Sequence, residues 1–362
     1  MSTQACIQPN PDIAGVGVRI SIYVQSTISL VQAILYTCDG ELDPNEQRTL
    51  QFTLFTLMIT AFALTLSAII QAHTSGLSVY HALIVLNLSW MLMTSALIVS
   101  IFAILHTIKS GMKTLMPSLL KKKIQTIVFP TLHLLVVGCF GIWVWADIDV
   151  FGDQPQCTTK TFTTIFGHNV AVTDKTIRSL FLAVYSFTAI PVANVLGFSV
   201  LVAASSFALP KLISLLLCGR KFDDKDEARL QYFSIVGILG LINIVFVVDT
   251  ELMIHRSKPM VFEGESAWTF GQTFSMLVLL PILGEYVATQ PRFKPSESQR
   301  EAARRLVVDA IGTNASSGDI DHATNSVLHA ALEALHPFET QAKLSRSIDS
   351  KLSQEKHAGG LV

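Results

Sequence analysis

Long apolar stretches alternate with short polar segments along most of this chain, and the pattern predicts membrane-crossing helices. Seven stretches are mostly apolar, and each is long enough to cross a hydrocarbon layer of about 30 Å as a helix. They cover residues 13–36, 49–72, 77–106, 124–146, 177–207, 231–255 and 266–290. We therefore expect an all-α fold, a polytopic membrane helix bundle with seven transmembrane helices (13–290), preceded by a short N-terminus (1–12) and followed by a tail (291–362).

Composition supports this interpretation. Of the 362 residues, 50% are hydrophobic and only 15% are charged, and the mean hydropathy is +0.49. The formal net charge is −1, and no basic patch interleaved with aromatic residues lies outside the membrane flanks. Nucleic acid is therefore not an expected partner, and the lipid bilayer is.

Lysine and arginine positions predict the orientation. Basic residues are concentrated between the third and fourth expected spans, and again after the fifth: Lys109, Lys113, Lys121, Lys122, Lys123, Lys211, Arg220, Lys221, Lys225 and Arg229. Such residues are enriched on the cytoplasmic side of membrane proteins. We expect the N-terminus outside, the tail in the cytoplasm, and the plasma membrane rather than an internal membrane.

Two of the cysteines are candidates for a disulfide. In the expected orientation, Cys6 and Cys157 are the pair on the oxidising side of the membrane. The alternative is two free thiols, because the sequence does not give their separation. No spacing of cysteine and histidine typical of a metal site is present, so no metal is expected.

Polar residues inside the expected spans are the first candidates for function, because they are costly in lipid. In the third span, Asn87, Trp90 and Thr94 recur at helical spacing and form a short polar stripe. This stripe is either one wall of a binding site or hydrogen-bonding contact between helices.

Three further spans add polar candidates. Asn194 follows Pro191 in the fifth span, where the proline predicts a kink that frees the backbone carbonyl near Phe187, with Thr188 and Asn194 close enough to engage the opened backbone. Asn243 lies in the sixth span and Glu285 in the seventh. Together with the stripe, Asn194, Asn243 and Glu285 complete a candidate intramembrane polar site.

A second candidate group lies near the outer end of the sixth span. Asp249, Glu251 and His255 are close in sequence, and Glu251 is four residues before His255, which allows a local pair on a helix. A histidine beside a carboxylate can titrate in the mildly acidic range. The alternative is a solvated cluster at the membrane boundary.

Signatures of known chemistry are missing from the sequence. The seventh span has no lysine for a retinal Schiff base, and no Walker loop, dinucleotide fingerprint, H-E-x-x-H or G-x-S-x-G occurs. We assign no catalytic residues and no cofactor. The spans also show no clear internal repeat of the kind many secondary transporters carry.

Four strings of residues resemble a family. They are NPDIAGVGVRISIYVQ at 10–25, GLSVYHALIVLNLSWM at 76–91, GIWVWADIDVFG at 141–152 and WTFGQTFSMLVLLP at 268–281. Together they resemble a group of fungal seven-span integral membrane proteins to which no function is assigned. The resemblance implies the architecture and brings no substrate or site residue.

The functional hypothesis rests on the tail and on the lack of catalytic motifs in the sequence. Residues 296–311 predict a helix, and the polar residues after Pro337 are typical of disorder, which suits a cytoplasmic partner. We expect a receptor-like sensor or regulatory protein with an unidentified ligand. The alternatives are a secondary transporter or channel for a small solute, and a membrane-embedded enzyme such as a terpene cyclase or isomerase.

Overall fold

The computed structural model describes residues 5–39, 44–109, 116–203 and 224–289, and in the tail residues 301, 304, 305 and 308. The chain forms two units, Met1–Thr289 and Gln290–Val362. Apart from those four residues, the expected tail helix and the polar segment after it lie outside the described residues, so the fold is that of the first unit. Its elements are α1 (Pro11–Ala14), α2 (Val16–Asp39), α3 (Pro44–Thr74), α4 (Val79–Lys109), α5 (Met116–Ala146), α6 (Pro155–Thr158), β1 (Phe162–Ile165), β2 (His168–Ala171), α7 (Lys175–Thr188), α8 (Pro191–Ala203), α10 (Asp224–Ser257), η2 (Lys258–Met260), α11 (Phe270–Leu277) and α12 (Leu279–Thr289).

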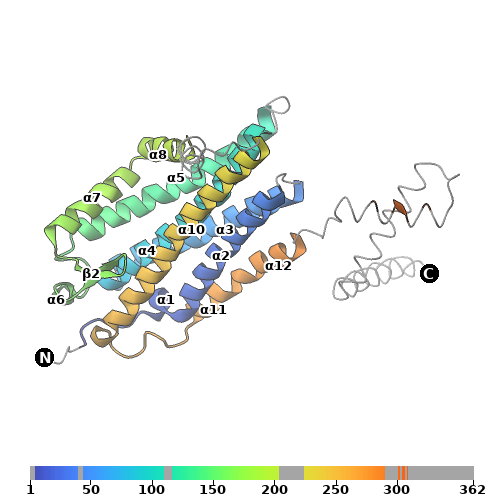
Figure 1. Ribbon diagram of the computed structural model, residues 1–362. Helices are drawn as coiled ribbons and strands as arrows, with labels where there is room; N and C mark the ends of the chain where they lie inside the picture. The colour runs from blue at the N-terminus through green and yellow to red at the C-terminus, as the bar shows by residue number, and fades with distance from the viewer. Residues whose placement is uncertain are drawn as a thin grey trace, which may run out of the picture. The chain divides into compact units, whose positions relative to one another are not determined.

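Long helices run side by side, and the β1–β2 hairpin, α6 and the N-terminal segment gather at one end of the bundle (Figure 1). We call this end the hairpin end. Helix α4 is central, because it packs against α2, α3, α5 and α10. Its side chains are buried on every face between Val79 and Ser89, apart from half-buried Asn87, as expected for a helix surrounded by other helices.

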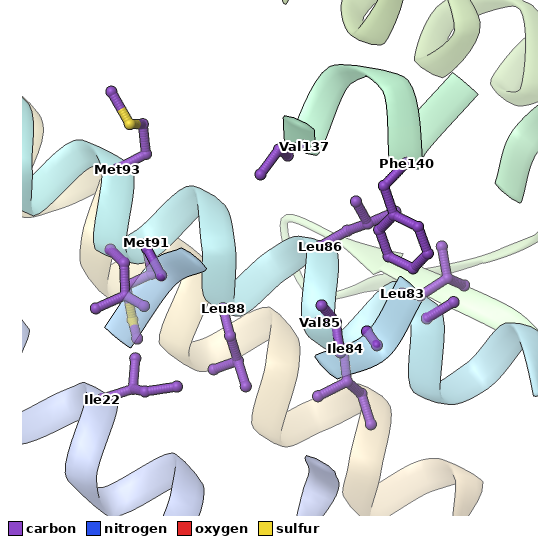
Figure 2. Packing of buried hydrophobic residues seen from close by; sticks show 14 of the residues in the cluster. Ile22, Leu83, Ile84, Val85, Leu86, Leu88, Met91, Met93, Val137 and Phe140 are labelled. Carbon is purple, nitrogen blue, oxygen red and sulfur yellow. The ribbon is translucent and has the colours of Figure 1, made fainter. Parts of the chain in front are cut away.

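Apolar packing around α4 forms the core. Figure 2 shows Leu86 beside Phe140 of α5, and Met91 facing Ile22 of α2. These four side chains are at most 2% exposed. Helix α4 therefore packs against both α5 and α2.

In the part of the chain that the structure describes, five helices are long and apolar enough to cross a membrane: Pro11–Leu35, Glu46–Thr74, Val79–Ile101, Val128–Ala146 and Phe233–Met260. They match the first, second, third, fourth and sixth expected spans. The broader expectation, a mostly helical chain with helices fit for a bilayer, is therefore confirmed. Within the described ranges, seven uninterrupted transmembrane helices are not found.

The fifth and seventh expected spans are each broken into two shorter helices. Helix α7 ends at Thr188 and α8 begins at Pro191, as the predicted proline kink requires, because proline has no N–H and its ring clashes with the preceding turn. In the seventh span, α11 ends at Leu277 and α12 begins at Leu279. Leu277 lies four residues before Pro281, where the proline ring meets the helix backbone.

The all-α prediction is incomplete, because residues 162–171 form an antiparallel hairpin. The turn residues Phe166 and Gly167 have φ of 48° and 79°, as a two-residue hairpin turn of the favoured handedness requires. The strands contain β-branched Thr163, Thr164 and Ile165. Each strand has only four residues, which is too short to stand out between two long apolar stretches.

Candidate functional site

A cavity of about 480 Å³ lies where α7 and α8 meet α4 and α5. It is partly open, and its walls are almost entirely apolar. Its lining residues are Trp90, Met93, Leu97, Leu134, Ala183, Val184, Phe187, Thr188, Asn194 and Gly197. The break between α7 and α8 thus forms part of the wall.

Asn194 stabilises the backbone at this break. Its side-chain Nδ2 donates to the carbonyl oxygen of Thr188 at 2.6 Å, and Asn194 is 7% exposed. In a continuous helix that carbonyl accepts a backbone N–H from the following turn. The side chain therefore supplies a hydrogen bond that the broken helix lacks, which is the role the sequence predicted for this region.

Trp90 of α4 is a second polar residue in the wall of the cavity. Its indole Nε1 donates to the hydroxyl oxygen of Tyr185 at 3.3 Å. The Tyr185 ring packs directly against α5, because α5 has a glycine, Gly141, at that position. A Cβ at Gly141 would lie 2.3 Å from the tyrosine ring. The described cavity wall therefore has the Trp90 indole, the Thr188 hydroxyl and the Asn194 amide among apolar groups, and all three are already hydrogen-bonded.

The six predicted intramembrane residues do not form one site. Trp90 and Asn194 line the cavity. Thr94 donates to Asn243 Oδ1 at 2.8 Å, a contact that joins α4 to α10. Asn87 is half-buried elsewhere on α4, and Glu285 of α12 accepts a hydrogen bond from Thr49 of α3 at 3.3 Å.

The three residues of the predicted cluster, Asp249, Glu251 and His255, have different surroundings in the structure. The Asp249 carboxylate accepts the N–H groups of Phe166 and Gly167 at 2.9 and 2.7 Å, so it holds the hairpin turn. Glu251 faces α2 instead, because residues two apart on a helix point in different directions. His255 is exposed and has no ion pair with Glu251 among the described side chains.

Arg19 and Glu251 connect α2 to α10. The Arg19 guanidinium forms an ion pair with Glu251 and donates from Nε to the Ala14 carbonyl at 2.9 Å. The Tyr23 hydroxyl donates to the same Glu251 oxygen at 2.7 Å. This charged group is therefore hydrogen-bonded from two sides, as an ion pair in a membrane-spanning region needs to be.

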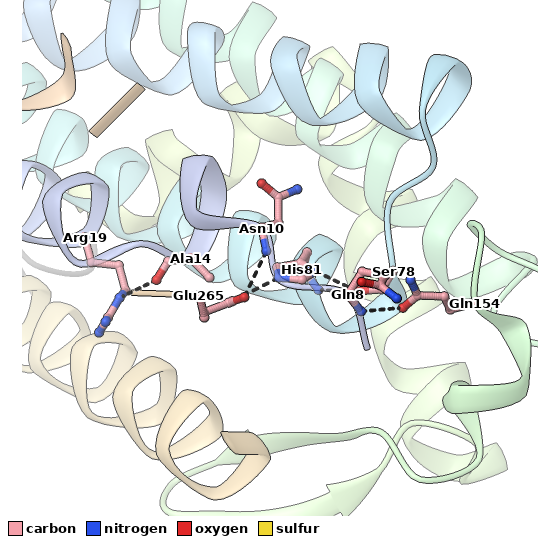
Figure 3. A network of polar contacts seen from close by, with 8 residues as sticks. All are labelled: Gln8, Asn10, Ala14, Arg19, Ser78, His81, Gln154 and Glu265. Atoms are coloured by element: carbon pink, nitrogen blue, oxygen red, sulfur yellow. Dashed lines mark hydrogen bonds and ion pairs between the residues drawn. The ribbon is translucent and has the colours of Figure 1, made fainter. Parts of the chain in front are cut away.

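His81 and Glu265 form a second polar contact at the hairpin end (Figure 3). His81 is 2% exposed. Its Nδ1 lies 2.7 Å from the Ser78 hydroxyl, and its Nε2 lies 3.0 Å from Glu265 Oε1. The other Glu265 oxygen accepts the Asn10 N–H at 2.9 Å, which ties the N-terminal segment to the segment before α11.

A disulfide joins the same N-terminal segment to α6. Cys6 and Cys157 are bonded, with their Cα atoms 5.9 Å apart. The neighbouring Ile7 pairs with Val261 in a parallel bridge, and the Gln8 N–H donates to the Gln154 side chain at 3.1 Å. The N-terminal segment, the segment that contains α6 and the segment around Val261 are therefore held together at the hairpin end.

Sequence reasoning missed a set of buried polar side chains on α2 and α3. We call these residues the polar seam: Ser21, Gln25, Ser29 and Gln32 of α2, and Thr49, Thr53, Thr56 and Thr60 of α3. They recur every three or four residues on both helices, a periodicity that the sequence already contains. Hydropathy averages hide it, because hydroxyl and amide residues count as only mildly polar.

Neither metal-binding groups nor known proteins identify a function for this site. Within the described ranges, no group of three or more His, Cys, Asp and Glu residues can hold a metal ion. The resemblance to fungal multi-pass proteins stays a prediction. No protein-family model, curated protein or solved structure matches this chain.

Proposed function

We propose that this chain is a receptor-like integral membrane protein whose cavity between α4, α5, α7 and α8 binds a neutral, apolar ligand. The observation that carries the proposal is the coincidence of this cavity with the helix break at Ile190, between Trp90 and Asn194. The volume of about 480 Å³ lies within the range of about 300–1,000 Å³ typical of small-molecule sites. No charged residue is among the described lining residues, which favours an uncharged ligand.

Seven crossings are part of this proposal. Together α7 and α8 are long enough to span about 30 Å at about 1.5 Å per residue, and so are α11 and α12. Both pairs expose large apolar side chains, among them Phe187 and Leu196 in the first pair and Phe274 and Leu280 in the second. Such surfaces suit contact with lipid better than contact with water.

The proposed orientation has the hairpin end outside the cell, at the plasma membrane. The Cys6–Cys157 disulfide supports this, because disulfides persist on the oxidising side of a membrane. The basic segments at 109–123 and 211–229 then lie in the cytoplasm, as the charge rule favours. A cytoplasmic partner would bind the tail.

A ligand in the cavity would touch both sides of the helix break. Phe187 and Thr188 belong to α7, whereas Asn194 and Gly197 belong to α8. A ligand that binds one arrangement of these two helices more tightly shifts the protein towards that arrangement. Helix α8 leads to residues 204–223, so its movement would reach the proposed cytoplasmic side.

Hydrogen–deuterium exchange of the full chain in lipid nanodiscs tests this proposal. Gly197→Phe adds a ring at the cavity wall and imitates occupancy; a Cβ at Gly197 makes only ordinary contact with Phe187, at 3.5 Å. Gly237→Phe on α10 is the matched control, because nothing lies within 4 Å of a Cβ there. Receptor-like sensing predicts changed exchange in α8 and the tail for the first variant only. A change confined to the cavity wall contradicts it.

A secondary transporter is the second candidate, favoured by the two broken helices. Discontinuous helices surround the substrate in several transporter folds. Here only the α7–α8 break lies at the cavity, which favours a receptor. Flux of a neutral solute into proteoliposomes, abolished by Gly197→Phe, would favour transport.

The proposed enzyme alternative lacks a facing pair of carboxylates among its candidates. Asp249 holds the hairpin turn, whereas Glu285 accepts from Thr49 near the opposite end of the bundle. General acid–base work requires both groups within reach of one substrate.

A further inference from the structure

The cavity between α4, α5, α7 and α8 lies far from both ends of the membrane-crossing stretch of α4. Trp90 lines the cavity, and it is 11 residues from each end of the stretch Val79–Ile101, counting from 79 to 90 and from 90 to 101. At about 1.5 Å per residue, it lies about 16 Å from either end. With α4 across the bilayer, the cavity is near the middle of a hydrocarbon layer of about 30 Å. A molecule that reaches the cavity therefore has to be soluble in that layer.

The α7 side of the cavity belongs to the surface that is proposed to face lipid. Helices α7 and α8 lie at one edge of the bundle (Figure 1). Val184 and Phe187 of α7 line the cavity and are exposed. They continue into the exposed apolar surface of both helices, which includes Leu180 and Leu196. This arrangement favours entry of a ligand from the bilayer rather than from water.

Hydrogen-bond donors in the cavity wall are almost all used. The Trp90 N–H donates to the Tyr185 hydroxyl oxygen, and the Thr188 hydroxyl donates to the Tyr185 carbonyl at 2.9 Å. One hydrogen of the Asn194 amide is used in the bond to the Thr188 carbonyl. Among the polar side chains of the described wall, only the second amide hydrogen of Asn194 has no acceptor.

Acceptor oxygens in the same wall are free. Asn194 is 7% exposed, and within the described ranges no hydrogen bond to its Oδ1 atom occurs. Oδ1 is also not among the enclosed polar atoms that lack a partner in this part of the chain. It therefore borders open space, and the cavity is the open space that Asn194 lines. The identity of this oxygen is fixed, because only the amide nitrogen can donate to the Thr188 carbonyl.

A neutral hydroxyl group suits this wall better than other polar groups. The Thr188 hydroxyl oxygen adds acceptor capacity, because a hydroxyl that donates one hydrogen bond can still accept another. A ketone, an ester or an ether can only accept, so it would leave Asn194 Oδ1 unpaired. A cationic donor would have no counter-charge among the described lining residues. A hydroxyl donates to the oxygen and can also accept the remaining amide hydrogen.

We propose that the cavity binds a neutral, bilayer-dissolved molecule with a hydroxyl group, which donates a hydrogen bond to Asn194 Oδ1. This inference rests on the ligand site proposed above and names the chemical class of its ligand. The simplest member of this class is a long-chain alcohol, whereas the corresponding methyl ether lacks the donor. Because the Asn194 amide also binds the Thr188 carbonyl, such a ligand contacts the side chain that links α8 to the end of α7.

Tryptophan quenching of the full chain in lipid nanodiscs tests this inference, because Trp90 is part of the cavity wall. The probes are bromoundecanol and its methyl ether, since bromine quenches indole fluorescence on contact. Gly197→Phe fills the cavity, so the quenching that this variant removes is the cavity signal. This difference excludes quenching at the other tryptophans, which are Trp143, Trp145 and Trp268. We expect the alcohol to reach half of the cavity signal at a lower mole fraction in the lipid than the ether.

Asn194→Leu should remove this preference. We expect the ratio of ether to alcohol mole fractions at half signal to fall about 3–10-fold, the effect of about one hydrogen bond. Comparing this ratio between variants cancels any difference in how the two probes distribute in the lipid. Asn243→Leu is the matched control, because Asn243 is also a buried amide but binds Thr94 outside the cavity. It should keep the wild-type ratio.

The outcomes separate this inference from the proposed ligand site. Equal half-signal mole fractions for alcohol and ether in the wild type overturn the hydroxyl contact but leave the ligand site standing, because both probes then bind. This comparison does not depend on the folding of Asn194→Leu. The same ratio in Asn194→Leu as in the wild type also overturns the hydroxyl contact alone. Quenching that Gly197→Phe does not reduce for either probe overturns the ligand site as well.

Discussion

Arg19 of α2 forms an ion pair with Glu251 of α10, although 232 positions separate them in the sequence. The Arg19 side chain is 12% exposed and that of Glu251 is 43% exposed. Both residues lie within helices that are apolar enough to cross a membrane. The contact therefore joins the beginning of the bundle to its last long helix, within two helices where unpaired charges are costly.

Removing this ion pair should destabilise the bundle. We expect Arg19→Met to cost about 1–3 kcal/mol, with the lower part of that range favoured because Glu251 is partly solvated. Glu251→Gln should cost less, because the amide oxygen still accepts from Tyr23. Denaturant titration of the purified protein in detergent gives both values. The double variant should cost less than the sum of the single ones, and strict additivity would contradict the pairing.

Cysteine substitution should show the same non-additivity for a different reason. Cys6→Ser and Cys157→Ser each remove the disulfide, so each should lower the melting temperature as much as the double variant does. Faster hydrogen exchange is expected in residues 5–10, which the bond ties to α6. Mass spectrometry of non-reduced peptides should find Cys6 linked to Cys157 in the wild type. Cys139→Ser, at an exposed free cysteine, is the control and should change neither property.

Glycosylation tests the proposed orientation. Ala171→Thr turns Asn169-Val-Ala into an acceptor sequence on exposed residues of β2. If the hairpin end is outside, this variant gains a glycan during expression in eukaryotic cells, whereas Asn169→Gln combined with it does not. The native acceptor at Asn314, outside the described residues, should stay unmodified. A glycan at Asn314 would reverse the orientation.

The hairpin turn should depend on Gly167. Its φ of 79° lies in the left-handed region, and only a Leu252 methyl, at 3.8 Å, is near a Cβ placed there. Gly167→Ala should therefore cost about 1 kcal/mol through backbone conformation rather than through a clash. Thermal unfolding measures this change. Gly237→Ala, in a helix with open space around it, should be neutral or stabilising.

Restoring the broken helix should alter the cavity. Pro191→Ala returns an N–H to the backbone and allows α7 and α8 to join, which competes with the Asn194–Thr188 hydrogen bond. We expect slower hydrogen exchange around Ile190 and weaker binding of apolar probes, measured with a fluorescent fatty-acid analogue. Pro130→Ala, at a proline inside the continuous helix α5, is the control. Unchanged exchange at Ile190 would mean that the proline does not maintain the break.

Apolar periodicity and proline positions predicted most of the fold. Stretches such as 77–106 are apolar on all sides, so their helical and membrane character follows from composition alone. The α7–α8 break was predictable because proline acts on its own turn. These are local properties of the chain, so they can be predicted directly from the sequence.

Contacts between distant segments were not predictable in the same way. Asp249, Glu251 and His255 are near one another in sequence, but helix geometry directs them to the hairpin, to α2 and to solvent. The partner of Glu251 is Arg19, and nothing in the spacing of either residue identifies the other. The polar seam was predictable in principle from its period of three to four residues on α2 and α3. Hydroxyl and amide residues lower the mean hydropathy only mildly, however, so both stretches resemble ordinary apolar spans.

The Cys6–Cys157 bond encloses α2, α3, α4 and α5 within a single covalent ring of the chain. The ring can close only after residue 157 has been synthesised, and α7 and α8 follow that residue in the chain. The cavity is therefore lined from both sides of the disulfide: Trp90 and Leu134 lie within the ring, whereas Phe187 and Asn194 lie outside it. A protease that cuts between α2 and α3 would leave two fragments that separate only after reduction.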